Sequence, residues 1–116
     1  MPELTLPSGV IPGDDEAQVC AKIHDRIEVY RAAAVENEVP AVMQLLPAVE
    51  DFELEVYSAA EQHDWGDQII EQLTIARREW STALAALSSG DESLADEHAA
   101  EALTHLDAAL TVDCPS

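Results

Sequence analysis

The chain has 116 residues, 47% hydrophobic and only 4% aromatic, which suits one domain with an aliphatic core. Its 24 acidic and 5 basic residues give a formal net charge of −19, so we expect no direct binding of nucleic acid or anionic membrane surfaces. Basic or apolar protein surfaces are the expected partners. Adaptation of a whole proteome to salt or to a GC-rich genome explains the same charge equally well. No apolar run approaches the roughly 18 residues of a membrane-spanning helix.

Residues 1–13 contain three prolines and two glycines, which excludes a regular helix and predicts an extended N-terminal arm. The arm either lies on its own domain or docks on a partner, a second copy in a homodimer included. Its candidate interaction residues are Leu4, Leu6, Val10 and Ile11. The segment lacks the basic start and apolar region of a signal peptide, which favours a cytoplasmic protein, while an exported mature form stays open.

Apolar residues in alternating steps of three and four predict a first helix over about residues 15–36 and a second over about 40–61. The first stripe contains Cys20, Ile23, Ile27, Tyr30 and Ala34, and the second contains Val42, Leu45, Val49, Phe52, Val56 and Ala59. Lys22, Arg26 and Arg31 lie off the first stripe. Pro47 interrupts the second helix and predicts either a kink or a short turn followed by a fresh start.

A third helix is predicted over about residues 65–88 and a fourth over about 91–112. We expect Asp64 to cap the third helix and Gly90 to end it in the left-handed conformation. The third stripe contains Ile69, Leu73, Ala76, Trp80, Ala83 and Leu87. The fourth helix is expected to bury Leu94, Ala99, Leu103, Leu106 and Leu110, with Ala95, Ala102 and Ala109 beside them.

Four helices of similar length joined by short turns predict an all-α fold, an antiparallel up-down-up-down four-helix bundle over residues 14–113. In that topology Cys20 and Cys114 lie at the same end, on neighbouring helices. A disulfide between them is therefore allowed by the topology. The alternative is a small core residue at Cys20 and a free tail thiol at Cys114.

A metal site is a further candidate, because His98, Glu101 and His105 share one face of the fourth helix. His98 and His105 are two turns apart, roughly 10 Å, so either would need Glu101 and a residue of another helix, for which His24 and His63 are candidates. The chain lacks the Glu-x-x-His motif of di-iron bundles. The alternative is histidines at a solvated boundary, and no cofactor is implied.

No nucleophile motif, phosphate-binding loop or His-Glu-x-x-His zinc motif is present, so we expect a non-enzymatic protein. The primary hypothesis is an adaptor, inhibitor or regulator acting through protein–protein interaction. The second is a nucleic-acid mimic that blocks a basic groove, because carboxylates such as Asp96, Glu97 and Glu101 follow one helix at short spacing. The third is a metal- or cofactor-binding bundle.

Overall fold

The computed structural model describes residues 14–115, which are all-helical and contain five helices. They are α1 (Glu16–Glu36), α2 (Val39–Met43), α3 (Leu46–Ala60), α4 (Asp64–Ser88) and α5 (Glu92–Leu110). The prediction of four helices is thus wrong in number, because the predicted second helix is divided into α2 and α3. No helix in this part of the chain combines the length and apolarity needed to cross a membrane.

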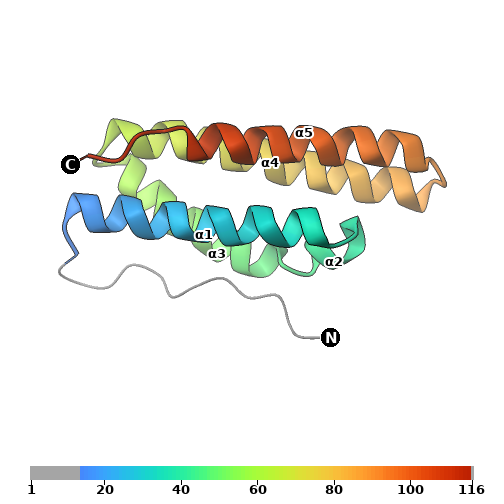
Figure 1. Cartoon of the computed structure of the whole chain (residues 1–116), viewed down its shortest axis with the longest axis horizontal. Helices are drawn as coiled ribbons and strands as arrows, with labels where there is room; N and C mark the ends of the chain where they lie inside the picture. The colour runs from blue at the N-terminus through green and yellow to red at the C-terminus, as the bar shows by residue number, and fades with distance from the viewer. Residues whose placement is uncertain (1–13, 116) are drawn as a thin grey trace.

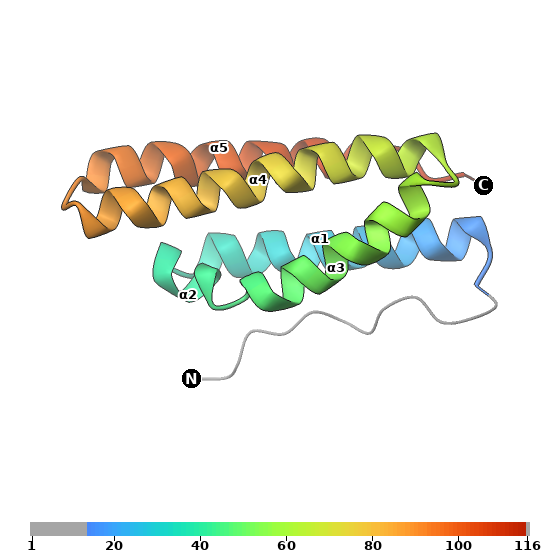
Figure 2. The same ribbon diagram turned by 180° about the vertical axis from the view of Figure 1, so that it is seen from behind.

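α1, α4 and α5 run along the long axis of the molecule, and α3 is inclined to it (Figure 1). α4 and α5 form an antiparallel hairpin, α1 runs beside it, and α3 crosses behind α1 in this view. The reverse view shows α3 descending from the start of α4 toward α2 (Figure 2). At the end where α4 turns into α5, the hairpin extends past α1 and α2.

α1 begins and ends at capping residues. The Asp15 side chain accepts a hydrogen bond from the Gln18 amide at 2.8 Å, and the Gln18 side chain accepts one from the Asp15 amide at the same distance. This reciprocal capping box satisfies two amides that the first turn leaves unpaired. Asn37 is the C-cap, and its side-chain amide donates to the Ala33 carbonyl at 2.7 Å. The predicted apolar stripe of α1 is fully buried.

The second predicted helix takes the form of a turn and a fresh start. α2 ends at Met43, and α3 begins at Leu46 with Pro47 in its first turn. Proline has no amide hydrogen, and its ring would collide with the carbonyl four residues earlier if the helix ran through. The apolar stripe from Val42 to Ala59 nevertheless remains buried on both sides of the break. The break therefore redirects the backbone without exposing the core face.

The α3–α4 and α4–α5 junctions depend on two glycines. At Gly66 an added Cβ would lie 2.6 Å from the Ala60 nitrogen, so the absence of a side chain allows α3 and α4 to approach. Gly90 has φ 83°, the left-handed conformation predicted for it. The prediction for Asp64 is wrong: the N-cap of α4 is His63, which makes no side-chain capping bond, and Asp64 is the first helical residue.

The buried face of α5 differs from the expected leucine face. Its fully buried residues are Ala95, Ala102, Leu106 and Ala109. Leu94 is 40% exposed, contrary to the prediction. Ala95 packs with Ala83 and Ala86 of α4, where small side chains permit a close helix pair. Leu103 and Leu110 are partly buried and pack against the main core.

Ion pairs join two arginines of α1 to carboxylates of α3 and α5. Arg31 on α1 pairs with Asp107 on α5, and Arg26 on α1 pairs with Glu55 on α3. The Arg26 side chain is only 3% exposed and lies over the ring of Phe52, so its expected place off the buried stripe is wrong. The guanidinium group therefore contacts both the aromatic ring and the Glu55 carboxylate.

Candidate functional site

A cleft of about 410 Å³ lies where the α4–α5 hairpin extends past the end of α1. α1, α2, α4, α5 and the segment between α1 and α2 all contribute to it. Its lining residues are Ala34, Asn37, Glu38, Val39, Pro40, Trp80, Leu87, Glu92, Ala95, Asp96, Ala99 and Leu103. The cleft therefore combines residues more than sixty positions apart in the chain.

The local sequence explains why this end is open. α1 stops at Glu36 because Asn37 is extended. α2 then begins at Val39, with Pro40 in its first turn. α4 continues to Ser88 without a partner of matching length on the α1 side. Small residues, among them Ala95 and Ala99, then leave room that larger side chains would fill.

The cleft has an apolar interior and an acidic rim. Trp80 is 1% exposed and forms part of the floor with partly buried Leu103. Glu38, Glu92 and Asp96 are exposed carboxylates at its edge. Among residues 14–115, no basic side chain lines the cleft. A ligand that fits both parts has an apolar group and a positive charge close to it.

A polar cluster lies in the core behind this floor. Glu53 is 4% exposed, and burial raises the pKa of its carboxyl despite the hydrogen bonds that it accepts from Arg77. Burial also raises the pKa of Tyr30, and the negative charge of Glu53 adds to the increase. Both groups are enclosed in the helical core and are not part of the cleft lining.

The predicted metal ligands do not converge. His98 Nδ1 lies 2.6 Å from Glu79 Oε2, and His105 Nδ1 lies 2.7 Å from Gln72 Oε1. Both histidines are therefore directed toward α4, whereas Glu101 is exposed. Within residues 14–115, three potential ligand atoms lie within 4.8 Å of one another only at Cys20, His24 and Cys114.

The predicted interaction residues divide into two groups. Asp96, Glu97 and Glu101 are all exposed on α5, and of these only Asp96 lines the cleft. Leu4, Leu6, Val10 and Ile11 lie outside the described residues. The arm and the homodimer proposed for it therefore remain predictions.

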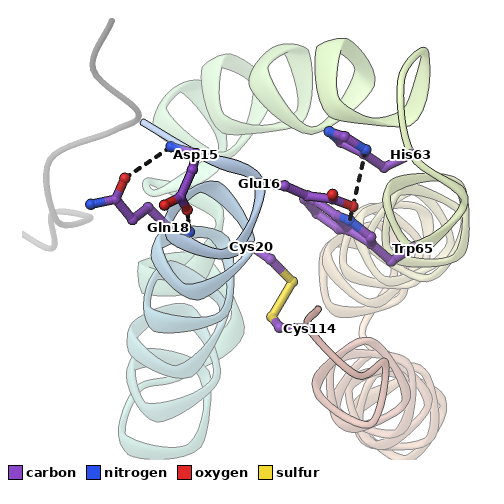
Figure 3. Close-up of a disulfide and its surroundings, with 7 residues drawn as sticks. All are labelled: Asp15, Glu16, Gln18, Cys20, His63, Trp65 and Cys114. Atoms are coloured by element: carbon purple, nitrogen blue, oxygen red, sulfur yellow. Dashed lines mark hydrogen bonds and ion pairs between the residues drawn. A yellow bond between two sulfur atoms is a disulfide. The ribbon is translucent and has the colours of Figure 1, made fainter. Parts of the chain in front are cut away.

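The opposite end of the molecule contains the cysteine pair (Figure 3). Cys20 of α1 and Cys114, just past α5, form a disulfide with Cα atoms 5.6 Å apart. In Figure 3, Glu16 reaches across from α1 toward the start of α4, where Trp65 Nε1 donates to its carboxylate at 2.8 Å. The His63 Nδ1 lies 3.1 Å from the same oxygen, and its ring stacks on Trp65.

The sequence did not indicate how several residues at these two ends are grouped. His24 follows Cys20 by four positions, so both share a face of α1, and this spacing was the available signal. Glu38 and Glu92 resemble any other acidic residue of an acidic chain. Their grouping depends on where α1 ends relative to α5, which the apolar pattern does not specify.

No protein-family model matches the chain. No curated protein and no solved structure matches it significantly.

Proposed function

We propose that this chain is a non-enzymatic binding protein whose acidic cleft receives a segment of a protein partner. That segment carries an apolar anchor residue next to Lys or Arg. The observation that carries the proposal is the cleft itself, with an apolar floor at Trp80 and Leu103 and a rim formed by Glu38, Glu92 and Asp96.

The size of the cleft suits an anchor side chain with its neighbours. Binding pockets for small groups typically measure about 300–1,000 Å³, and this one is about 410 Å³. Apolar area removed from water contributes roughly 25 cal/mol per Å² before the costs of association are subtracted. An aliphatic or aromatic anchor on the floor is therefore the expected source of affinity.

Charge gives the cleft its selectivity. The rim carboxylates lie on a chain whose formal net charge is −19, so a basic segment is attracted from a distance and an acidic one is repelled. Attraction between exposed charges is screened as salt is added, with a Debye length of about 10 Å at 0.1 M and about 3 Å at 1 M. The proposed binding is thus salt-dependent but retains an apolar component at high salt.

The architecture that supports the cleft is an antiparallel up-down-up-down four-helix bundle in which α2 and α3 together form the second member. Two features favour this assignment: the buried stripe continues across the break at residues 44–45, and the helices alternate in direction. The break between α2 and α3 contributes to the cleft, because it allows α2 to place Val39 and Pro40 in the lining.

The test uses a displayed library of short peptides of random sequence, from which the proposal predicts enrichment of one Leu, Phe or Trp next to Lys or Arg. Peptides selected by the wild-type protein are measured against two pairs of variants. In the first pair, Asp96→Lys reverses a rim charge, and Glu97→Lys makes the same charge change at the adjacent exposed position outside the lining. In the second pair, Ala99→Leu fills the cleft, and Ala100→Leu adds the same side chain at an exposed position outside it.

We expect Asp96→Lys and Ala99→Leu to weaken binding about tenfold or more, which corresponds to about 1.4 kcal/mol, whereas the matched controls retain most of it. Equal losses for Asp96→Lys and Glu97→Lys would contradict the cleft and favour the nucleic-acid mimic, in which the whole acidic row of α5 binds. Selection of peptides without basic residues would also contradict the proposal.

A further inference from the structure

The disulfide end of the molecule contains a third ligand-type side chain that neither the fold nor the cleft requires. An imidazole nitrogen of His24 and the sulfur atoms of Cys20 and Cys114 all lie within 4.8 Å of one another. His24 is one helical turn after Cys20 on α1, and Cys114 reaches the same point from the segment after α5. Two distant parts of the chain thus bring two sulfurs and an imidazole together.

A second, independent observation concerns the hydrogen bonding of the His24 ring. Its Nε2 atom is buried and has no hydrogen-bond partner among the described residues. A buried polar nitrogen without a partner is uncommon in native structures, because it has lost its water without replacement. A metal ion or a proton donor at this position would remove that cost.

We propose that Cys20, His24 and Cys114 form a Zn²⁺ site when the disulfide is reduced. Zinc binds cysteine sulfur at about 2.3 Å and histidine nitrogen at about 2.0–2.1 Å, which places tetrahedral ligand atoms somewhat under 4 Å apart. After reduction the two sulfurs separate from bonding distance toward that spacing, while the histidine nitrogen approaches. Adjustment of side-chain torsions and of the irregular segment around Cys114 is sufficient, since the Cα atoms are already 5.6 Å apart.

The chemical steps balance with a dithiol as the reductant. The dithiol transfers two electrons and two protons to the Cys20–Cys114 bond, giving two thiols and the oxidised, disulfide form of the reductant. The two thiols then release two protons as their sulfurs bind Zn²⁺, and neutral His24 supplies the third ligand. Water completes the tetrahedron, with access at Cys114, which is only partly buried. The same residues therefore hold either a covalent bond or a metal ion.

The ligand set explains why zinc is the proposed ion. Thiolate and imidazole ligands select zinc and other thiophilic ions, whereas calcium and magnesium require oxygen ligands. The chain offers many carboxylates elsewhere, so general attraction of cations by its charge must be separated from a specific site. The redox requirement makes that separation, because the oxidised chain has the same carboxylates and lacks the thiolates.

The experiment is titration of the whole chain with Co²⁺ and Zn²⁺ without oxygen, after reduction with a phosphine and its removal, alongside the untreated disulfide form. We expect the reduced chain to bind one Co²⁺ with the thiolate charge-transfer band and the visible bands of a tetrahedral complex, and Zn²⁺ to displace it. The oxidised chain should show neither band. His24→Ala should weaken metal binding more than about tenfold. This is a lower bound, because even residues that only hydrogen-bond to a metal ligand typically change metal affinity about 10–100-fold when mutated.

His98→Ala is the matched control, because it removes a histidine from the set predicted on α5 and leaves this end intact. Circular dichroism of each sample reports whether the reduced chain remains helical. A reduced, helical chain that binds no Co²⁺ would overturn the proposal, as would an unfolded reduced chain that one equivalent of Zn²⁺ fails to refold. Loss of the bands in His98→Ala with full binding in His24→Ala would overturn it as well.

Discussion

Glu53 of α3 and Arg77 of α4 form an ion pair in which the Arg77 Nε donates to both carboxylate oxygens, at 3.0 and 3.1 Å. The two partners differ in environment: the Glu53 side chain is 6% exposed and that of Arg77 is 34% exposed. Burial raises the pKa of Glu53 above its usual 4.5, and the hydrogen bonds from Arg77 oppose that increase without cancelling it.

This relationship predicts how Glu53→Gln changes the pH dependence of stability. Between pH 4.5 and its raised native pKa, the Glu53 carboxyl binds more protons in the folded than in the unfolded chain. Its contribution to stability is therefore fully present below pH 4.5 and is lost as the pH rises through the native pKa. As the pH rises through this range, the wild type should lose stability relative to Glu53→Gln. Urea midpoints at several pH values measure the difference. Asp51→Asn, at an exposed carboxylate of the same helix, is the matched control.

A second prediction concerns Arg26, whose guanidinium carbon lies 4.4 Å from the centre of the Phe52 ring. Its Nε and Nη2 are buried and have no hydrogen-bond partner among the described residues, so Glu55 is important for its charge. Glu55→Ala should cost about 2 kcal/mol, less than the 3–5 of a fully buried pair because Glu55 is 38% exposed.

Arg26→Met should cost less than Glu55→Ala, since it removes the charge and keeps contact with Phe52. Chemical denaturation compares both variants with Glu61→Ala, which removes an exposed carboxylate at the end of α3. The account of Arg26 fails if Arg26→Met is the more damaging change.

Gly66 gives a third prediction, in which sterics and helix propensity have opposite signs. Alanine inside a helix is favoured over glycine by about 1 kcal/mol. At Gly66, however, the new Cβ would lie 2.6–2.7 Å from backbone atoms of Ala60, and backbone cannot move aside as a flexible side chain can. Gly66→Ala should therefore destabilise the protein by about 1–3 kcal/mol. Thermal unfolding beside Ser81→Ala, an exposed position in α4, tests it: stabilisation by both changes would show that α3 retreats freely.

The fourth prediction concerns reduction of the disulfide in metal-free protein. The bond joins residues separated by 94 positions, and the chain-entropy model gives about 4–5 kcal/mol for a loop of this size. A reductant with a chelator should lower the free energy of unfolding of the wild type by roughly that amount. Cys114→Ser, which cannot form the bond, should have the stability of the reduced wild type whether or not reductant is present. A response in Cys114→Ser would assign the effect to something other than this bond.

The stripes of α1, α3 and α4 could be predicted from spacing alone, because a helix that packs on one side must place apolar residues every three to four positions. α5 was harder, since it offers a leucine face and an alanine face. The close contact with α4 favours the alanines and leaves Leu94 exposed. Pattern reasoning ranks side chains by hydrophobicity, whereas a tight helix pair selects them by size.

The two ends of the molecule differ in how far the sequence could predict them. The topology predicted from the sequence placed Cys20 and Cys114 at the same end of the molecule, so it allowed the disulfide without requiring it. The cleft depends on the unequal lengths of α1 and α4, and on the direction in which α2 leaves α1. Helix lengths differing by a turn have nearly the same periodicity, so the pattern contains no signal for the volume between them.

The position of the disulfide has a mechanical consequence. It joins the first turns of α1 to the segment just past α5, so nearly the whole helical domain lies inside the covalent loop. Tension applied between residues 14 and 115 passes through the sulfur–sulfur bond and bypasses residues 21–113. Only about nine residues can then extend, about 30 Å at roughly 3.5 Å each. The oxidised chain can therefore carry a load between its two ends while the cleft keeps its shape, and reduction removes that protection.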